Sequence, residues 1–417
     1  MTFESAVREF RSLPYLTLIL VAAGCSANGS AGSKAIVRDS AGVEIVENAG
    51  PLWPEGAGWR LSQRPILNLG EIESAPEYQL YRVFDAVRLD DGRVVVANSG
   101  ANELRFYDST GSYLGSAGRE GGGPGEFEGL RSLTTLAEDS LLTYDWRQRR
   151  ISVFDSKGAF SRSFTPEPLA GTAAFADQVA PLANGSFLIK AQSIGAGGVM
   201  DGLRSDTLSL LLCDGEGALL DTLMTFAGGE RLYKTARSGD HISVMVRGRL
   251  WSPEPQLAAY SDGYFFGSGD SFEVGYYSSA SGLQRLIRLH QPELLVTDQD
   301  IERYKREEME EIDDENDRRR FEEALADMPF TQTFPAYDAL LVDSEGNLWL
   351  EEYPSPGLEA PSTWKVFDNA GVLLGTVETP YRFRPFQIGP DFVLGRWLDE
   401  FDIEHVHLYE LLKPELE

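Results

Sequence analysis

The sequence predicts an all-β fold made of six similar units, each a meander of four antiparallel strands. Two turn signatures recur along the 417 residues, and equivalent residues of neighbouring units are almost evenly spaced. Asp108 and Asp155 lie 47 residues apart, and Gly70 and Gly118 lie 48 apart. Four strands in about 40–50 residues is the repeat of one β-propeller blade. We therefore predict a six-bladed β-propeller with a helical insertion near residues 298–328.

The first signature is a turn that starts at Asp and ends at Gly, between two β-rich runs. In the copy at residues 106–111, Asp108 follows an aromatic pair and Gly111 precedes a new strand-like run. The Asp carboxylate can accept from backbone N–H groups two residues further on, and Gly supplies the positive φ. We expect a β-hairpin at every copy, namely at residues 37–42, 106–111, 154–158, 212–217 and 367–371.

The second signature is a Gly-containing turn that lies earlier in the same units, at residues 89–92, 182–185, 261–263 and 342–346. Together the two turns give the order strand, turn, strand, loop, strand, turn, strand. The six units then cover residues 84–118, 130–165, 178–226, 255–290, 336–377 and 383–411.

The sixth unit has only three clear strands, so its outer edge needs a partner. Segments Val43–Val46 and Pro65–Leu69 are β-rich and precede the first unit. Pairing them with the sixth unit would close the ring and remove the open edge. A seventh unit is the alternative, if residues 226–250 conceal a weak one.

Residues 298–328 interrupt the strand pattern. Thr297 can cap a helix, and two apolar stripes at helical spacing follow it: Ile301, Tyr304 and Ile312, then Phe321, Leu325 and Met328. The acidic stretch 313–317 between them lacks the glycine and the ligand spacing of an EF-hand. We predict two helices with a solvated junction, inserted between the fourth and fifth units as a flap over one face.

The N-terminus has the marks of a secretory signal. Arg8 and Arg11 precede an apolar run, too short to span a bilayer, that ends in small residues before Cys25. This ending resembles the lipobox of bacterial lipoproteins, in which the signal is removed and the cysteine carries a diacylglycerol. The resemblance implies a signal at residues 1–24, lipidation at Cys25, a flexible tether at 25–35 and a propeller domain at 36–417. An ordinary signal with an incidental Cys is the alternative.

The resemblance also bears on location, because Ser26 stands where Asp would retain a lipoprotein in the inner membrane. We expect a lipid-anchored protein of the cell envelope, in the outer membrane and facing the periplasm. The membrane is then a partner through Cys25. The net charge of −28 repels nucleic acid, so we expect no nucleic-acid partner.

Cysteine usage limits the chemistry further. Cys213, the one cysteine besides Cys25, lies in an apolar run and reads as a small buried hydrophobe. With Cys25 lipidated, the mature chain has neither a disulfide nor a cysteine metal cluster.

The decapeptide GREGGGPGEF, residues 118–127, could be taken for a phosphate-binding loop. Such a loop follows a strand and opens a helix, whose N-terminus favours the anion. Here the chain continues into another β run at residues 130–136. We therefore predict a connector between the last strand of one unit and the first strand of the next, with Phe127 packed beneath it.

Enzyme signatures are sparse. His405 and His407 fall on one face of a strand and could form half of a metal site, but the sequence offers no third ligand. Residues 278–282 contain part of a G-x-S-x-G pattern without the strand-to-helix context of a nucleophile elbow. We assign no catalytic residue, metal or cofactor from the sequence.

The Asp-x-x-Gly turn at 106–111 followed by GREGGGPGEF resembles the repeat pattern of NHL-type propellers. More widely, residues 38–48 and 340–349 resemble six-bladed NHL-repeat or TolB-like propeller lipoproteins of Gram-negative bacteria. The resemblance covers most of residues 36–411. It implies the fold and the location, and it carries over no reaction.

Two functions stay open. The first is a non-catalytic binding or scaffold module for a protein, peptide or glycan. Its ligand face would be built from the loops between second and third strands and those that link units, which carry Arg119, Trp146, Arg147, Tyr353 and Trp397. The second is a periplasmic propeller enzyme, a metal-dependent lyase or lactonase with its site in the central channel. We expect a monomer in either case.

Overall fold

The computed structural model describes residues 34–70, 75–172, 174–192, 201–238, 241–326, 328–354 and 358–414. Lys34–Glu417 forms one compact unit. The predicted signal, Cys25 and most of the predicted tether lie outside the described residues, so these predictions stay untested. No helix of the described ranges is both long and apolar enough to cross a membrane.

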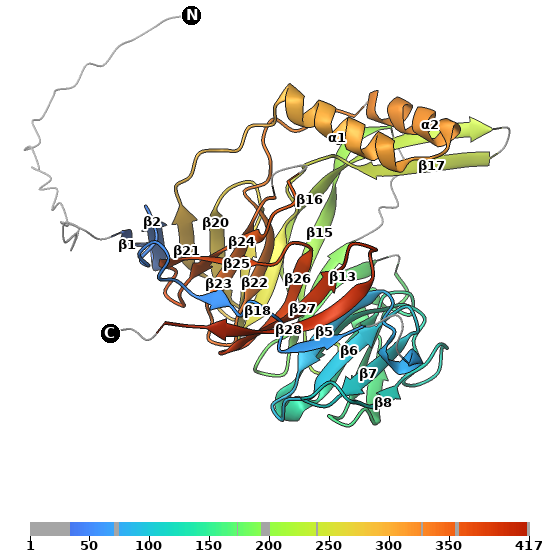
Figure 1. The fold of residues 1–417 in the computed structure, drawn as a ribbon, viewed down its shortest axis with the longest axis vertical. Coiled ribbons are helices and arrows are strands. Elements are labelled where there is room, and N and C mark those ends of the chain that lie inside the picture. The colour runs from blue at the N-terminus through green and yellow to red at the C-terminus, as the bar shows by residue number, and fades with distance from the viewer. Residues whose placement is uncertain are drawn as a thin grey trace, which may run out of the picture. The chain divides into compact units, whose positions relative to one another are not determined.

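In these ranges the strands form six sheets, each with an antiparallel meander (Figure 1). Three sheets have four strands and contain no others. They comprise β5 (Val83–Arg88), β6 (Val94–Asn98), β7 (Glu103–Tyr107) and β8 (Tyr113–Ala117); β9 (Leu130–Thr135), β10 (Leu141–Asp145), β11 (Arg150–Phe154) and β12 (Phe160–Phe164); and β22 (Tyr337–Val342), β23 (Leu348–Glu352), β24 (Ser362–Phe367) and β25 (Leu373–Thr379).

The other three sheets carry additional strands. The third sheet comprises β13 (Phe175–Pro181), β14 (Phe187–Gln192), β15 (Gly202–Cys213), β16 (Leu219–Ser238) and β17 (His241–Gly248). The fourth comprises β18 (Gln256–Tyr260), β19 (Gly263–Gly267), β20 (Glu273–Ser278) and β21 (Gly282–Leu289), joined by β1 (Ala35–Ser40) and β2 (Val43–Asn48). The sixth comprises β26 (Phe383–Ile388), β27 (Phe392–Leu398) and β28 (Glu404–Leu412), joined by β3 (Arg60–Leu61) and β4 (Leu67–Leu69). Single-turn 3-10 helices lie at Pro76–Tyr78, Ala137–Asp139 and Glu167–Leu169.

The Asp turns form as predicted. Oδ1 of Asp108 accepts from the N–H groups of Thr110 and Ser112, both at 2.9 Å. The same pair of bonds, to residues two and four positions on, is made by Asp155, Asp214, Asp343, Asp368 and Asp399. Sequence reasoning missed the turn at Asp399 because Asp402, with φ 61°, takes the place of the usual Gly.

Each sheet packs on two neighbours because alternate residues of a strand point to opposite faces. In β6, Val94 and Val96 enter the cluster shared with the sheet of β26–β28, whereas Val95 and Ala97 enter the cluster shared with the sheet of β9–β12. Further clusters join the remaining sheets in chain order. The contacts therefore run in a closed circuit in which the last sheet packs on the first, as in a β-propeller.

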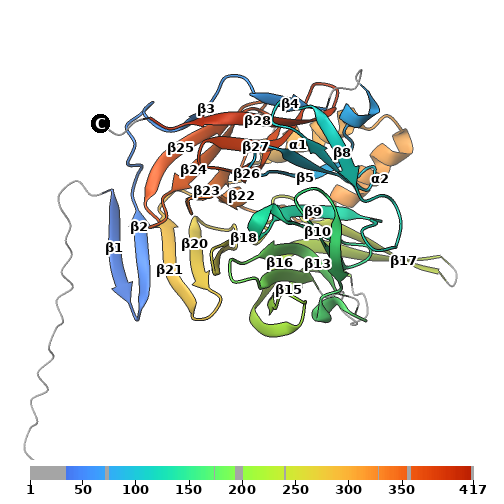
Figure 2. The ribbon, with the colours of Figure 1, turned by 90° about the horizontal axis from the view of Figure 1, so that it is seen from below.

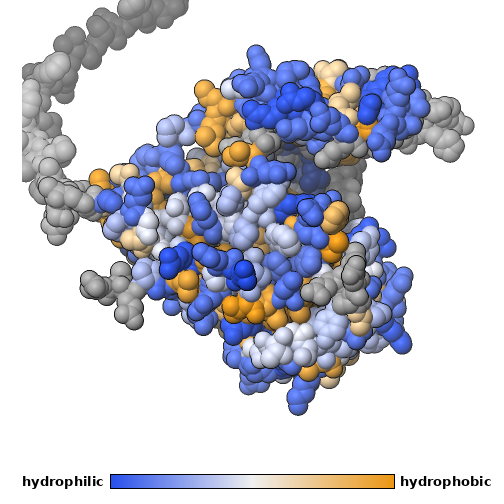
Figure 3. All heavy atoms as spheres, viewed as in Figure 1, coloured by the Kyte–Doolittle hydropathy of each residue, from blue (hydrophilic) through white to orange (hydrophobic). Residues whose placement is uncertain are grey.

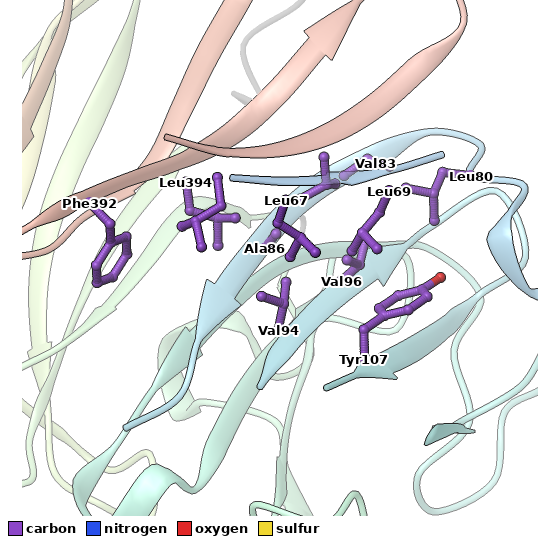
Figure 4. Close-up of a cluster of buried hydrophobic side chains, with 12 residues drawn as sticks. Leu67, Leu69, Leu80, Val83, Ala86, Val94, Val96, Tyr107, Phe392 and Leu394 are labelled. Atoms are coloured by element: carbon purple, nitrogen blue, oxygen red, sulfur yellow. The ribbon is translucent and has the colours of Figure 1, made fainter. Parts of the chain in front are cut away.

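The two N-terminal segments have different partners. The segment Pro65–Leu69 behaves as predicted, since β4 pairs with β28 and supplies the outer strand of the last sheet (Figure 4). The prediction for Val43–Val46 is wrong. This segment lies in β2, which pairs in parallel with β21 and adds the β1–β2 hairpin to the outside of the fourth sheet (Figure 2).

Asn48 explains why β2 takes this position. Its side chain is fully buried and donates to the carbonyls of Arg288 and Gly371, at 3.1 and 3.0 Å. Its oxygen accepts from the Leu373 N–H at 2.8 Å. One amide thus joins the fourth sheet to the fifth, an arrangement that the strand pattern alone does not reveal.

Residues 226–250 conceal no separate sheet in the part of the chain that the structure describes. They belong to the long β16 and to β17, which pairs with the second half of β16 and extends the third sheet. Figure 1 shows this extension beside α1 (Asp298–Glu311) and α2 (Glu315–Ala326). Arg249, which follows β17, donates to the carbonyls of Pro329 and Phe330 at 2.9 and 2.7 Å.

The helices form as the sequence predicts. Thr297 caps α1 in a reciprocal capping box with Asp300. Phe321, Leu325 and Met328 are buried, and Figure 3 shows hydrophilic residues over most of the visible face of the two helices. Trp251 anchors the insertion, since its ring centroid lies 5.9 Å from that of Tyr304 in α1.

The glycine-rich decapeptide is a connector, as predicted, because it joins β8 to β9. Phe127 is 1% exposed, and a Cβ on Gly118, where φ is 81°, would lie 2.4 Å from its ring. Arg150 donates to the carbonyls of Gly122, Gly123 and Glu126. The glycines therefore serve a tight turn over an aromatic ring.

Candidate functional site

All six sheets contribute to one central cavity of about 980 Å³. Its wall carries six acidic and six basic side chains. The acids are Asp85, Asp177, Asp206, Glu254, Asp338 and Glu351, and the bases are Arg131, Lys190, Arg231, Arg382, Arg384 and Arg396. Because a cavity into which several charged groups converge is the usual place of a ligand site, this wall is the candidate functional site.

Five of these twelve residues lie in the first strand of a meander, namely Asp85, Arg131, Asp177, Asp338 and Arg384. Register shifts interrupt four of these strands beside cavity residues, for example between Val83 and Asp85 in β5 and between Tyr337 and Leu340 in β22. A β-bulge redirects a side chain and is frequent beside functional sites. The bulges let apolar neighbours stay in the inter-sheet clusters while charged residues face the cavity.

The charge of one guanidinium, that of Arg384, acts on three carboxyl groups of the cavity wall. Burial raises the pKa of Asp85 to about 7, although the N–H groups of Leu133 and Ala86 and the charge of Arg384 lower it. Burial likewise raises the pKa of Glu351 to about 7, with the Ser362 hydroxyl and Arg384 opposing this change. These groups are partly protonated near neutral pH.

Asp338 is the third carboxyl of this set. Its side chain is exposed to the cavity, and desolvation by the surrounding walls raises its pKa, which the charge of Arg384 opposes. Its negative charge also contributes to the raised pKa of Glu351. Arg384 therefore acts on all three carboxyls.

The third sheet and its neighbour β9 form a second group of charges. Asp177 accepts ion pairs from Lys190 at 2.7 Å and from Arg131 at 3.5 Å. Asp206 pairs with Arg231 at 3.4 Å and accepts from the Tyr233 hydroxyl at 2.7 Å. This side of the cavity wall therefore carries three bases and, with Glu254, three acids, and at Asp177 two of the bases share one carboxylate.

Three residues of the ligand face predicted from the sequence lie on adjacent loops. Arg119 is 80% exposed and pairs with Glu126 at 2.6 Å. Trp146 is 43% exposed, with the Arg147 guanidinium 5.4 Å from its ring centroid. Gln148 joins the two loops through a hydrogen bond to the Gly121 carbonyl.

The other two residues are packed elsewhere. Tyr353 stacks on Phe334 with centroids 5.6 Å apart, and burial raises the pKa of Tyr353 to about 12. Trp397 stacks on His407 at 5.0 Å and donates to the Tyr381 carbonyl. The structure thus brings Arg119, Trp146 and Arg147 together without Tyr353 and Trp397, and none of the five lines the cavity.

His405 and His407 point into a polar cluster on β28 and do not line the cavity. The side-chain oxygen of Asn68 lies 3.2 Å from His405 Nδ1 and 3.1 Å from His407 Nε2. Burial, assisted by His405, lowers the pKa of His407 to about 4. In the described ranges no three His, Cys, Asp or Glu side chains are grouped to hold a metal ion.

A second cavity of about 780 Å³ lies where the segment before β3 crosses β25. Trp53 and Trp59 line it, with ring centroids 5.2 Å apart. Trp53 covers Gly375, and its backbone N–H donates to the Leu374 carbonyl at 2.7 Å. These indoles attach the N-terminal segment to the fifth sheet, so we interpret this cavity as packing.

Sequence reasoning missed the residues of the central cavity. The signal was present, because a charged residue stands second or third in five of the six first strands: Asp85, Arg131, Asp177, Asp338 and Arg384. Strand periodicity places these residues on one face without showing that the faces of different sheets converge.

No family profile matches the sequence, and no curated protein matches it. Solved structures are similar in fold. An exported protein from Bacteroides fragilis is 10% identical, with 88% of this chain and 100% of that chain covered, at a TM-score of 0.51. A DUF4221-family member from Bacteroides vulgatus is 9% identical, covering 86% and 98%, at 0.48. Virginiamycin B lyase from Staphylococcus aureus is 9% identical, covering 83% and 99%, at 0.40.

The class that these observations define is the β-propeller. The sheet topology and the circuit of inter-sheet clusters carry this conclusion, and the likeness to the Bacteroides fragilis protein agrees with it. At 10% identity the likeness concerns the fold alone.

Proposed function

We propose that this chain is an envelope lipoprotein whose propeller binds a charged ligand in its central cavity without catalysing a reaction on it. One observation carries the proposal, which is the charged cavity of about 980 Å³. Its volume lies within the range of small-molecule and peptide sites. A wall with six acids and six bases fits a polar ligand and would bind an apolar one poorly.

The propeller in this proposal has six blades. The six sheets of the described residues and the inter-sheet clusters that connect them in a closed circuit support this number. In each blade the first strand contributes to the cavity wall, so a ligand there would contact several blades at once.

The proposed anchor predicts a change of location. Replacing Cys25 by serine removes the thiol that would carry the diacylglycerol, so the chain should lose labelled palmitate and move from the membrane fraction to the soluble periplasmic fraction. Fractionation and palmitate labelling measure both effects. Ser26→Ala, which keeps the cysteine, is the matched control and should remain lipidated. Retention of the label by the Cys25→Ser chain contradicts a lipid anchor at Cys25.

The proposed site predicts that ligand capture depends on Arg131, a base of the cavity wall. The purified mature chain is incubated with cell-envelope extract, and bound molecules are identified by mass spectrometry. Reversing the charge with Arg131→Glu should reduce recovery of the ligand at least about tenfold, since hydrogen bonds to charged groups contribute 1.5–3 kcal/mol. Glu310→Gln, an exposed position on α1, is the control and should bind normally.

Equal recovery by all three chains contradicts binding in the cavity. Recovery that depends instead on Trp146 assigns the ligand to the outer face predicted from the sequence. Thermal unfolding shows whether Arg131→Glu folds, and we expect it to fold because this side chain is 37% exposed.

An enzyme is the second candidate, and one observation favours it. Asp85 and Glu351 have pKa values of about 7, which suits a general acid or base at neutral pH. For a metal-dependent enzyme, the described residues contain no group of three His, Cys, Asp or Glu side chains that could hold the metal ion. Conversion of the recovered ligand by the chain, or stoichiometric zinc or calcium in it, would replace the binding proposal with this one.

A further inference from the structure

We infer that the cavity ligand is a short peptide with free ends, whose ammonium group is bound by Asp338 and Glu351 and whose carboxylate is bound by Arg131. The inference rests on the proposed function, since it takes the cavity as the ligand site. Three features support it. They are an excess of carboxyl groups at one place, an excess of cations at another, and buried polar atoms without partners on the same wall.

The carboxyl excess lies around Arg384. When all are ionised, the three carboxyls Asp85, Asp338 and Glu351 exceed the one guanidinium by two charges. Within the described residues none of the three forms an ion pair with a Lys, Arg or His side chain. Unpaired charges are costly where burial limits their solvation, as at Asp85 and Glu351, and a ligand ammonium group would offset this cost.

The cation excess lies at Asp177, which is shared by two bases. Lys190 is 9% exposed and takes the shorter contact, 2.7 Å, while Arg131 is left at 3.5 Å. One carboxylate can neutralise one of these two cations. A ligand carboxylate would neutralise the other, and the planar guanidinium of Arg131 suits carboxylate in two-point contact.

Uncharged parts of the wall favour a ligand with amide groups. The hydroxyl of Ser132 and the Nε of Arg396 are buried, line the cavity and have no hydrogen-bond partner. A peptide carbonyl can accept from both kinds of donor. The volume of about 980 Å³ is at the upper end for such sites, which favours a peptide over a single amino acid.

Other ligand classes fit this wall less well. A neutral glycan would leave both charge excesses uncompensated. A phosphorylated ligand would meet the three carboxyls, and a purely cationic ligand would leave the second cation at Asp177 without a partner. The zwitterion alone matches both places.

An ammonium group bound at Asp338 and Glu351 makes binding depend on pH. Burial and the charge of Asp338 raise the pKa of Glu351, whereas Arg384 and the Ser362 hydroxyl lower it. A ligand ammonium beside Glu351 would lower this pKa further, because it stabilises the ionised carboxylate. Binding therefore releases protons, and affinity should rise from pH 6 to about pH 7.5. Above about pH 8 the peptide α-amino group itself loses its proton, so affinity should fall.

The test compares three forms of one probe, a mixed pool of tripeptides that is free, N-acetylated or C-amidated. Equilibrium dialysis against the purified mature chain, read by mass spectrometry, measures the bound fraction. We expect N-acetylation to weaken binding at least about tenfold, because it removes an ammonium bound by charge-assisted hydrogen bonds. C-amidation should weaken it by a smaller factor.

Matched variants separate the two ends. The double variant Asp338→Asn/Glu351→Gln should lose the preference for free over N-acetylated peptides. Arg131→Gln should lose the preference for free over C-amidated peptides and keep the other. Glu310→Gln should behave as the parent chain, and circular dichroism checks that each variant is folded.

Equal binding of free and N-acetylated peptides overturns the inference, and so does the absence of binding by the whole free pool. A different result contradicts the proposed function, namely capture from envelope extract that does not depend on Arg131. A captured ligand that depends on Arg131 but carries no ammonium group would preserve the proposed function and exclude a peptide.

Discussion

Replacing Trp349 by alanine is expected to lower the free energy of unfolding by about 4 kcal/mol, the usual range for a buried tryptophan being 3–5. Trp349 is 1% exposed in the cluster between the fifth and sixth sheets. Its ring contacts Trp364 and Trp59, with centroids 6.5 and 6.1 Å away. The substitution leaves a cavity that β-sheet backbone cannot easily collapse to fill.

A hydrogen bond adds to this loss. Nε1 of Trp349 donates to Asp343 Oδ2 at 3.1 Å, and Asp343 is itself 2% exposed. Without the indole, the buried carboxylate keeps its bonds to Asn347 and the backbone but loses one donor. The substitution therefore weakens an Asp turn together with the apolar cluster.

Guanidinium unfolding followed by tryptophan fluorescence measures the change. Trp146→Ala is the control, since this ring is 43% exposed and its removal should cost less than about 1 kcal/mol. Equal losses in the two variants would show that the fifth and sixth sheets are not held by this cluster.

The repeat itself could be read from the sequence because each copy carries a local cause. Asp108 bonds to N–H groups two and four residues on, and the following Gly adopts positive φ. Such turns need only a few consecutive residues, so they are visible in a single sequence. The turn at Asp399 was not predicted, because Asp402 adopts the left-handed conformation in place of Gly.

What the sequence did not reveal depends on contacts between distant residues. The parallel pairing of β2 with β21 is supported by Asn48, whose partners lie more than 200 residues away. The cavity likewise depends on convergence, since Asp85 and Arg384 come from the first and the last sheet. Local patterns predicted a charged residue in a strand without showing what it would face.

The ligand face predicted from the sequence illustrates the same limit. Exposed aromatic and arginine residues are common at interfaces, which led to Trp397 and Tyr353. In the structure these rings stack on His407 and Phe334. These contacts give both rings a packing partner, and their part in binding a ligand stays a prediction.

Replacing both Leu67 and Leu69 by alanine is expected to cost about 5 kcal/mol or more. Each buried leucine typically contributes 2–5 kcal/mol, and two neighbours in one cluster need not add. Both side chains are buried in β4, 6% and 2% exposed, where the last sheet packs on the first (Figure 4). A loss of this size is comparable to the whole stability of many domains, so the variant should be largely unfolded at 37 °C.

The reason for so large an effect is the closure of the circuit. β28 is the last strand of the described residues, and β4 gives it an outer partner through the pairs Leu69–Val406 and Leu67–Leu408. Weakening β4 therefore exposes the edge of β28 and loosens the sheet that carries Arg384 and Arg396 into the cavity. Ligand capture should be lost together with stability.

Ile66→Ala is the matched control because Ile66 precedes β4 directly and is 60% exposed, so it should cost less than about 1 kcal/mol. Thermal unfolding and amide hydrogen exchange of β28 give the two readouts. If the leucine variant unfolded near the temperature of the control, with the amides of β28 still protected, the N-terminal strand would not be what closes the propeller. Early exchange confined to β26–β28 would instead show that closure protects the last sheet and, through it, the cavity.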